Sequence, residues 1–280
     1  MRVHLCGVRG STPAPGQAYL RYGGNTSCVA IVHDGAPAPA LILDAGTGLR
    51  GVTPLLAGQP FAGTILLTHL HWDHVHGLPF FTAGDRDDAR VSLLLPAQPD
   101  GSAALEVLSR AMSPPHFPIT PEGLRGRWTF GTIGEGRLKA EGFTVEAREI
   151  PHKGGRAFGY RVSDGHSVVA YLPDHCPTAL GPGPDGWGEY HRAALDLAAG
   201  ADLLIHDAFL LPDEVAGEAY FGHAAADYAA MLGRLAGARA VLLTHHKPDR
   251  TDAELDKLAA RMAASHPGVT VAAEGSTLDL

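Results

Sequence analysis

The chain has 280 residues, a length that fits one large domain or two small ones. Its formal net charge is −8 and no stripe of lysine and arginine is visible, so we expect long nucleic acid not to be its partner. No apolar run is long enough to cross a membrane, and no secretory signal pattern opens the sequence. These features predict a cytoplasmic protein without a membrane partner.

Short apolar runs, rich in β-branched residues and bounded by Gly, Pro or Asp, recur along the chain and predict strands. They span residues 3–8, 27–32, 41–43, 64–68, 91–95, 143–150, 158–162, 167–172, 203–205, 241–244 and 269–273. Helices are predicted at 102–112, 189–199 and 224–235, and the capping-box sequence TDAE at 251–254 predicts one more. Strands and helices that alternate in this way predict a layered α/β fold.

No linker divides the sequence, and we therefore predict one domain over residues 1–280. The most irregular stretch, residues 96–136, contains many Pro and Gly residues, and we interpret it as an insertion or a lid. Within it, residues 113–118 could form an apolar wall over the substrate.

Histidine is the unusual component of the sequence, because there are 16 of them and only three scattered cysteines. Four potential ligands gather in the segment THLHWDHVHG, which directly follows a predicted strand. His69 and His71 are two residues apart, so on an extended chain they point the same way. Asp73 and His74 fall where the chain turns toward a helix. The two pairs can therefore face two different metal ions, and imidazole with carboxylate suits zinc, iron or manganese.

The spacing HxHxDHxxG resembles the metallo-β-lactamase-fold hydrolase superfamily, and the resemblance covers nearly the whole chain. It implies a four-layer αββα sandwich with metal ions at one edge of the sheets. Further matches to the family's motifs each follow a predicted strand. They imply that Asp44 orients groups beside the metals and that Asp174 bridges both ions. His152 would be a third ligand with His69 and His71. His245 would be a ligand with Asp73 and His74.

The implied cofactor is a pair of divalent ions, with zinc as the first choice and manganese or iron as alternatives. His246 rivals His245 for its place. We prefer His245 because it directly follows the apolar strand, where the family's ligand stands.

Two other segments resemble the tRNase Z-like phosphodiesterase branch of this superfamily. Residues 205–209 and 221–225 look like its HEAT-type and HST-type motifs, with Asp in place of Glu and Ala in place of Ser. The resemblance implies that His206 contacts the scissile phosphate and that His223 assists catalysis. Asp73 is expected to be catalytic as well, because it would hold the second ion and orient the hydroxide.

These residues predict a binuclear metal-dependent phosphodiesterase in which a metal-bridging hydroxide attacks a small or cyclic phosphodiester. The connection between His152 and Asp174 is too short for the basic arm that long-form tRNA enzymes insert there, and this supports a small substrate. Three alternatives remain: a tRNase Z-like 3′ processing endonuclease, an ester, lactone or thioester hydrolase, and a non-hydrolytic metal-binding redox or sensor module. A homodimer is compatible with the predicted edge strands.

Overall fold

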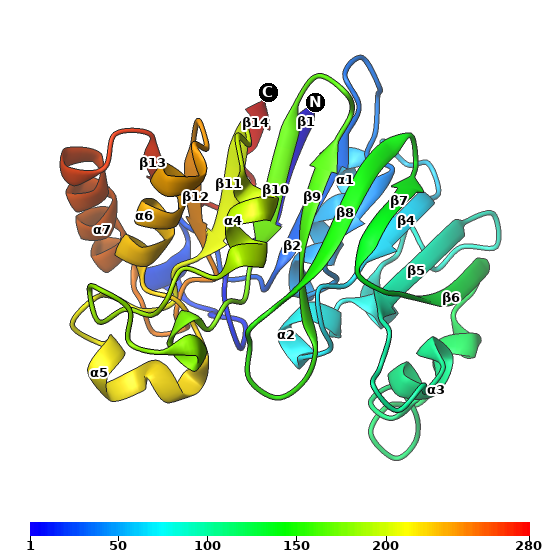
Figure 1. The fold of residues 1–280 in the computed structure, drawn as a ribbon. Helices are drawn as coiled ribbons and strands as arrows, with labels where there is room; N and C mark the ends of the chain where they lie inside the picture. Colours follow the sequence, from blue (N-terminus) through cyan, green and yellow to red (C-terminus); the bar gives the residue numbers. More distant parts are fainter.

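Two seven-stranded β-sheets pack face to face and carry helices on their outer faces, as Figure 1 shows for the computed structural model of residues 1–280. This is the αββα sandwich that the sequence led us to expect. The chain runs through the first sheet, crosses to the second, and returns to the first only with its last strand. The two termini consequently lie side by side, and the Met1 amino group donates a hydrogen bond to the Leu280 carbonyl.

The first sheet has the order β14-β1-β2-β3-β4-β5-β6, and its strands β3 to β6 are parallel. The strands are β1 (Arg2–Gly7), β2 (Cys28–Val32), β3 (Leu41–Leu43), β4 (Ala62–Leu66), β5 (Arg90–Pro96), β6 (Arg127–Ile133) and β14 (Thr277–Asp279). Apolar side chains cover both faces of its central strands, since β2 and β3 are buried at every residue.

The second sheet has the order β13-β12-β11-β10-β9-β8-β7, with β10 to β13 parallel. Its strands are β7 (Gly136–Ala140), β8 (Phe143–Ile150), β9 (Ala157–Ser163), β10 (Val168–Leu172), β11 (Leu203–Asp207), β12 (Val241–Thr244) and β13 (Val269–Val271). Strand β8 is antiparallel to β9, which is antiparallel to β10. The carboxyl ends of β8, β10, β11 and β12 therefore meet at one edge.

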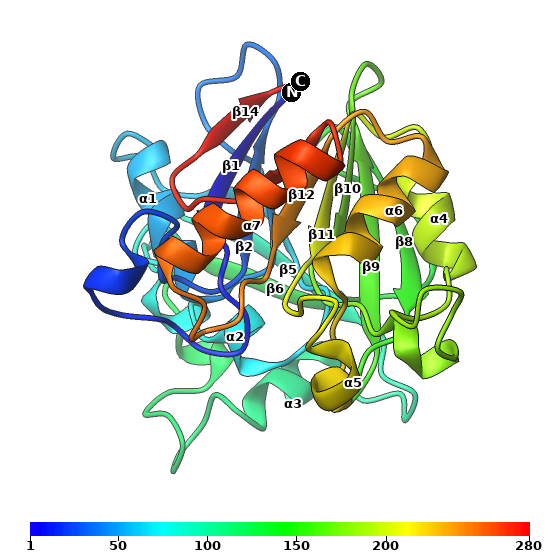
Figure 2. The same cartoon turned by 90° about the vertical axis from the view of Figure 1, so that its left-hand side faces the viewer.

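The longer helices cover the outer face of the second sheet (Figure 2). They are α4 (Arg192–Ala198), α6 (Ala226–Ala236) and α7 (Asp252–Ser265). Helix α7 begins with the predicted capping box, in which the Thr251 side chain accepts from the Glu254 amide and the Glu254 side chain accepts in return. None of the helices is long and apolar enough to cross a membrane.

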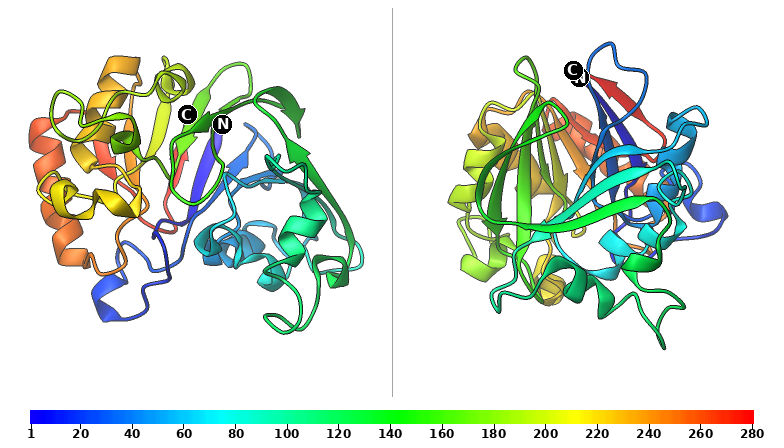
Figure 3. Two further views of the ribbon diagram at one scale, coloured as in Figure 1. Left: turned by 60° about the horizontal axis from the view of Figure 1, so that its bottom comes forward. Right: turned by 90° about the vertical axis from the view of Figure 1, so that its right-hand side faces the viewer.

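The remaining helices are short, and several lie at the edge where the parallel strands end (Figures 1 and 3). They include α1 (Val52–Leu55), α2 (Trp72–Val75), α3 (Ala104–Ser109), α5 (Val215–Glu218) and the 3₁₀ helices η3 (Leu78–Phe80) and η6 (Ala219–Phe221). Two segments, one around α3 and one around α5, extend beyond this edge on opposite sides. The metal ligands were expected at this same edge of the sheets.

The structure differs from our expectation within residues 96–136. Residues 127–133 form β6, which pairs with β5 along its whole length, and β7 begins at Gly136. Only residues 97–126 are an irregular connection, with α3 inside it. Strands β6, β7 and β14 were missed because their exposed faces carry charged or small residues that break the apolar runs.

Candidate metal centre

All seven side chains expected to bind metal converge at one edge of the sandwich. His69, His71 and His152 form one set, and Asp73, His74 and His245 form another, with the ligand atoms of each set within 4.8 Å of one another. The first set joins the end of β4 to the end of β8, and the second joins helix α2 to the end of β12. Sequence-distant residues meet here because the strands that precede them end at the same edge.

Asp174 stands between the two sets and turns one carboxylate oxygen toward each. Its Oδ1 lies 3.6 Å from His152 Nε2 and 3.9 Å from His69 Nε2. Its Oδ2 lies 2.9 Å from both His74 Nε2 and His245 Nδ1. A carboxylate in this position is placed to bridge two cations.

Several buried polar atoms at this edge have no hydrogen-bond partner. They are His69 Nε2, His74 Nε2, both ring nitrogens of His245, and Asp174 Oδ2. The short distances to Asp174 therefore do not have the geometry of hydrogen bonds. Buried polar groups are normally paired, and imidazole and carboxylate are ligands that zinc accepts. The residues present thus fit a pair of divalent cations.

The protonation of the two sets differs. Burial lowers the pKa of His69, His71 and His152, so these rings are neutral and offer lone pairs. Burial alone would also lower the pKa of His245, but the nearby carboxylate of Asp174 raises it to about 10. The pKa of His74 is raised in the same way. A metal ion would have to displace these protons.

Asp44 contacts the metal centre from behind. It is fully buried, its Oδ2 accepts from His74 Nδ1 at 2.8 Å and from the Tyr171 hydroxyl at 3.0 Å, and its Oδ1 accepts from the Thr68 amide at 2.7 Å. Its φ of 61° is a left-handed conformation that costs free energy in a residue with a side chain. The contacts fix the ring orientation of His74, the task that the sequence assigned to Asp44.

The amino-terminal loop that contains Gly10 and Ser11 contacts the second set. The Ser11 amide donates to Asp73 Oδ2 at 2.7 Å. A Cβ at Gly10 would clash with the ring of His245, which explains the glycine there. Arg9 of this loop is fully buried and donates to the carbonyls of Gly23 and Arg250.

The choice between the two neighbouring histidines after β12 is resolved by their contacts. The His245 ring approaches both Asp73 and Asp174, at a φ of 59°. His246 points the other way, is fully buried, and has its Nε2 2.8 Å from the Ala272 carbonyl. Only His245 therefore lies among the candidate ligands.

His206 does not lie where we expected it. Its Nε2 is 3.1 Å from His175 Nδ1, its Nδ1 is 2.8 Å from the Asp207 carbonyl, and its ring packs near Tyr228 of helix α6. The side chain is fully buried on the helix-covered face of the sheet. Side chains alternate along a strand, and His206 shares the face of Leu204 rather than the face of Ile205. A contact between His206 and a phosphate is therefore excluded by its position.

Asp207 and His223 are brought together at the metal edge instead. His223 Nδ1 lies 2.9 Å from Asp207 Oδ2 and 3.7 Å from Asp174 Oδ1. The same Asp207 oxygen accepts from the amide of His175. Asp207 takes the place of the motif's Glu in the sequence, but it was expected to support His206 and not to pair with His223, because the substrate contact was assigned to His206.

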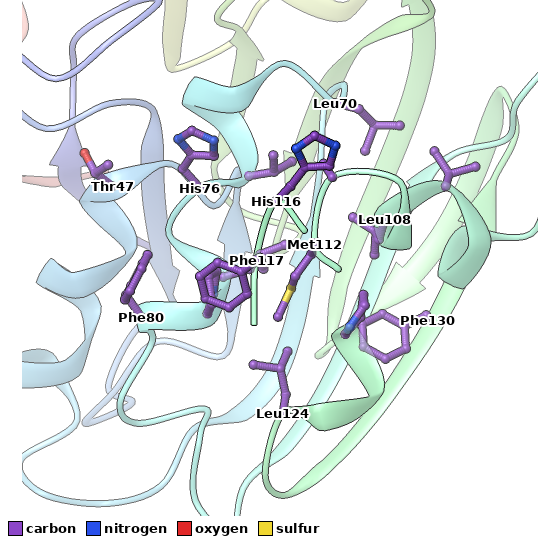
Figure 4. Close-up of a pocket in the computed structure, with 16 residues that line it drawn as sticks. Thr47, Leu70, His76, Phe80, Leu108, Met112, His116, Phe117, Leu124 and Phe130 are labelled. Carbon is purple, nitrogen blue, oxygen red and sulfur yellow. The ribbon is translucent and has the colours of Figure 1, made fainter. Parts of the chain in front are cut away.

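An apolar cavity of about 400 Å³ lies beside the metal centre (Figure 4). Segment 97–126 forms one wall through residues such as Met112 and Phe117, and the segment after His69 forms the other through Leu70, His76 and Phe80. None of the seven candidate ligands lines it. The predicted apolar wall is thus present, but it is next to the metal edge rather than above it.

Comparison with known sequences decides the family. The profile of the beta-lactamase superfamily domain matches residues 40–246. The chain belongs to this superfamily. It is therefore a hydrolase of the metallo-β-lactamase fold, and the matched region contains every candidate ligand from His69 to His245, together with Asp44.

The superfamily relatives agree on fold. A ribonuclease Z from Salinibacter ruber is 30% identical over 223 residues, which cover 65% of this chain and 67% of that protein. The metallo-β-lactamase-fold protein YhfI from Bacillus subtilis superposes with a TM-score of 0.70 at 19% identity, covering 99% of both chains. The short form of human tRNase Z superposes with a TM-score of 0.67 at 21% identity, covering 100% of this chain and 99% of that one.

Proposed function

We propose that this hydrolase cleaves phosphodiester bonds with two divalent cations held at the metal edge. The observation that carries the proposal is the orientation of Asp174, which turns one oxygen toward each ligand set. When bound, such ions act as Lewis acids and lower the pKa of bound water from about 15.7 to about 7. The relatives named ribonuclease Z support a phosphodiester over an acyl substrate.

The residues of the chain have distinct tasks in this proposal. Asp73 is fixed by the Ser11 amide and would hold the second ion and orient the attacking water. His223 donates its Nδ1 proton to Asp207, which leaves Nε2 to exchange a proton with a phosphate oxygen or the leaving group. His206 has no catalytic task.

An RNA is the first substrate to test. We expected long nucleic acid not to bind, but the relatives named ribonuclease Z act on RNA and weigh against that expectation. We therefore rank a precursor tRNA, cleaved at its 3′ end, as the first candidate substrate. Small or cyclic phosphodiesters stay as the second candidate, because the net charge is −8 and β9 and β10 form only a short hairpin between His152 and Asp174.

The test is a substrate panel with protein loaded with zinc or manganese. The panel contains a precursor tRNA, a single-stranded RNA, a cyclic nucleotide, a chromogenic phosphodiester, a thioester and a lactone. We expect turnover of phosphodiesters that depends on metal and on Asp73. Faster turnover of the thioester or lactone would contradict the proposal, and iron content without any hydrolysis would favour the redox or sensor alternative.

A further inference from the structure

The exposed aromatic side chains of this protein are concentrated at the metal edge. Eight large hydrophobic side chains are exposed, and the four aromatic ones are Trp72, Phe80, Tyr220 and Phe221. All four belong to the short helices α2, η3 and η6 beside the candidate ligands. Single exposed apolar residues are ordinary on a protein surface, but a concentration of them indicates a binding site.

The aromatic residues flank the first ligand set on two sides. Trp72 stands between the candidate ligands His71 and Asp73 and is 67% exposed. On the other side, the Gly222 carbonyl, directly after Phe221, lies 2.9 Å from His152 Nδ1. His152 Nε2 is 3.2 Å from His71 Nδ1, so the His71–His152 pair lies between the two aromatic groups.

Both groups pack against neighbouring rings. Trp72 stacks on His76 with 5.4 Å between ring centroids and 18° between planes. Tyr220 and Phe221 have centroids 4.3 Å apart, and Phe221 lies 6.1 Å from Phe209. Phe209 in turn stacks on His223 at 4.4 Å and connects this group to the catalytic side chains. Each aromatic group is therefore in contact with a ring beside it and still exposes ring surface to the solvent.

A lysine side chain lies between the metal edge and the aromatic pair Tyr220 and Phe221. Lys153 directly follows His152, its Nζ donates to the Tyr220 carbonyl at 2.8 Å, and it is exposed. Its Nζ is 5.8 Å from the centroid of the Tyr220 ring. An exposed ammonium next to aromatic faces is the combination with which proteins hold the backbone and the bases of single-stranded nucleic acids.

We propose that Trp72 on one side and Tyr220 with Phe221 on the other are stacking platforms for the nucleobases that flank the scissile phosphate. The inference rests on the proposed function and specifies its substrate as a nucleoside phosphodiester. Lys153 pairs with a phosphate oxygen beside the reacting one. Because every base has a π-face, the platforms tolerate different sequences.

Steady-state cleavage of a single-stranded RNA oligonucleotide by the metal-loaded enzyme tests the platforms. Base stacking on an aromatic side chain corresponds to roughly 5- to 150-fold in affinity per base. We expect Trp72→Ala and Tyr220→Ala each to raise KM by about that factor, with metal content unchanged. Trp72→Phe restores most of the affinity. Leu20→Ala, which removes a side chain that is 74% exposed outside the metal edge, is the matched control and leaves KM unchanged.

A substrate change gives the complementary result. An oligonucleotide that lacks the base stacked on Trp72 should bind the wild type as weakly as the intact oligonucleotide binds Trp72→Ala. The affinity of Trp72→Ala for this abasic oligonucleotide should be no lower than that of the wild type. An equal loss from Trp72→Ala on intact and abasic substrates would overturn the inference, because it would show that Trp72 acts on the fold or the metals.

Tryptophan fluorescence separates this inference from the proposed function. Stacking of the oligonucleotide on Trp72 should quench the emission of the metal-loaded wild type and leave that of Trp72→Phe unchanged, since the other tryptophans, Trp128 and Trp187, are outside the platforms. Quenching without cleavage of any phosphodiester would retain the platforms and reject the proposed function. Cleavage with unaltered KM in both alanine variants would reject the platforms and retain the proposed function.

Discussion

Histidines gather in two clusters, one at the metal edge and one beneath the helices of the second sheet, and only the first has the features of a metal centre. At the metal edge, histidine nitrogens face the carboxylates of Asp73 and Asp174. In the other cluster, which we call the helix-side cluster, His175, His191 and His206 pack together near Tyr228. There the two closest rings share a hydrogen bond, and burial keeps the pKa of His175 and His206 low.

The comparison shows that buried histidines with free nitrogens are not sufficient for a metal centre. His175 Nε2 and His191 Nδ1 also have no hydrogen-bond partner. What differs is the charge, because only the metal edge has carboxylates that can balance a divalent cation. Asp207 and His206 stand next to each other on β11 and belong to different clusters, since alternate side chains of a strand face opposite ways.

The largest effect is expected from removing the bridging carboxylate. Asp174→Ala should lower turnover by on the order of 10³-fold or more and should reduce the metal content of both sites, because Asp174 turns one carboxylate oxygen toward each set. Elemental analysis and turnover on one phosphodiester measure this. The control is Asp227→Ala, which removes another buried aspartate. It pairs with Arg261 and His266, outside the candidate ligands, so this variant should keep its metals. Full metal content in Asp174→Ala would contradict the bridge.

His223 and Asp207 should act together on the rate. We expect His223→Ala to lower turnover by roughly 10²–10⁴-fold, the range for a positioned proton-transfer group, with metal retained. The double variant with Asp207→Asn should be no slower than the slower single variant, because Asp207 acts through the His223 ring. Since His223 also lies close to His152 and Asp174, a loss of metal in His223→Ala would instead identify it as a ligand.

Much of the metal edge could be predicted because the sequence resembles the motifs of the superfamily. The resemblance implied that the residues after the runs 64–68, 143–150, 167–172 and 241–244 share the metal ions. These residues do meet, at the edge where the strands before them end. The motif around His69 added the ligand spacing. The long capped helix and the central strands could be predicted because their apolar residues follow a clear pattern.

The sequence does not indicate which side chains of β11 face the metal edge. The run LLIHDAF is apolar on both faces, so nothing in it indicates whether His206 or Asp207 faces the metal edge. The register of β11 with β10 and β12 determines which side chains face that edge, and this register is a property of the whole sheet. Edge strand β6 was missed for a related reason, because its residues alternate between exposed and partly buried without a continuous apolar run.

A moderate effect is expected from the carboxylate behind the metal edge. Asp44→Asn keeps the size of the side chain but weakens its hold on His74 Nδ1. Loss of such an orienting partner typically costs 10–100-fold in metal affinity. Competition with a chelator measures the affinity. An unchanged affinity together with lowered thermal stability would show that Asp44 serves only the backbone of Thr68.

The smallest effect on activity is expected in the helix-side cluster. His206→Leu removes the partner of the Asp207 carbonyl and of His175 Nδ1. Unpaired buried groups cost about 1–3 kcal/mol, so the variant should be less stable, with an unchanged rate per folded molecule and unchanged metal content. Denaturant unfolding and turnover measure the two quantities. A slower rate with full metal would contradict the assignment and return His206 to the mechanism.

The difference in unfolding free energy between the wild type and His206→Leu should also depend on pH. Burial lowers the pKa of His206 below its model-peptide value of 6.5, so the unfolded chain takes up a proton there before the folded protein does. The stability that neutral His206 contributes is therefore present above pH 6.5 and lost as the pH falls below it. Metal-free wild type and His206→Leu should differ most in unfolding free energy near pH 8 and less near pH 5. A difference that grows toward acid pH would show that the folded protein holds His206 in its charged form.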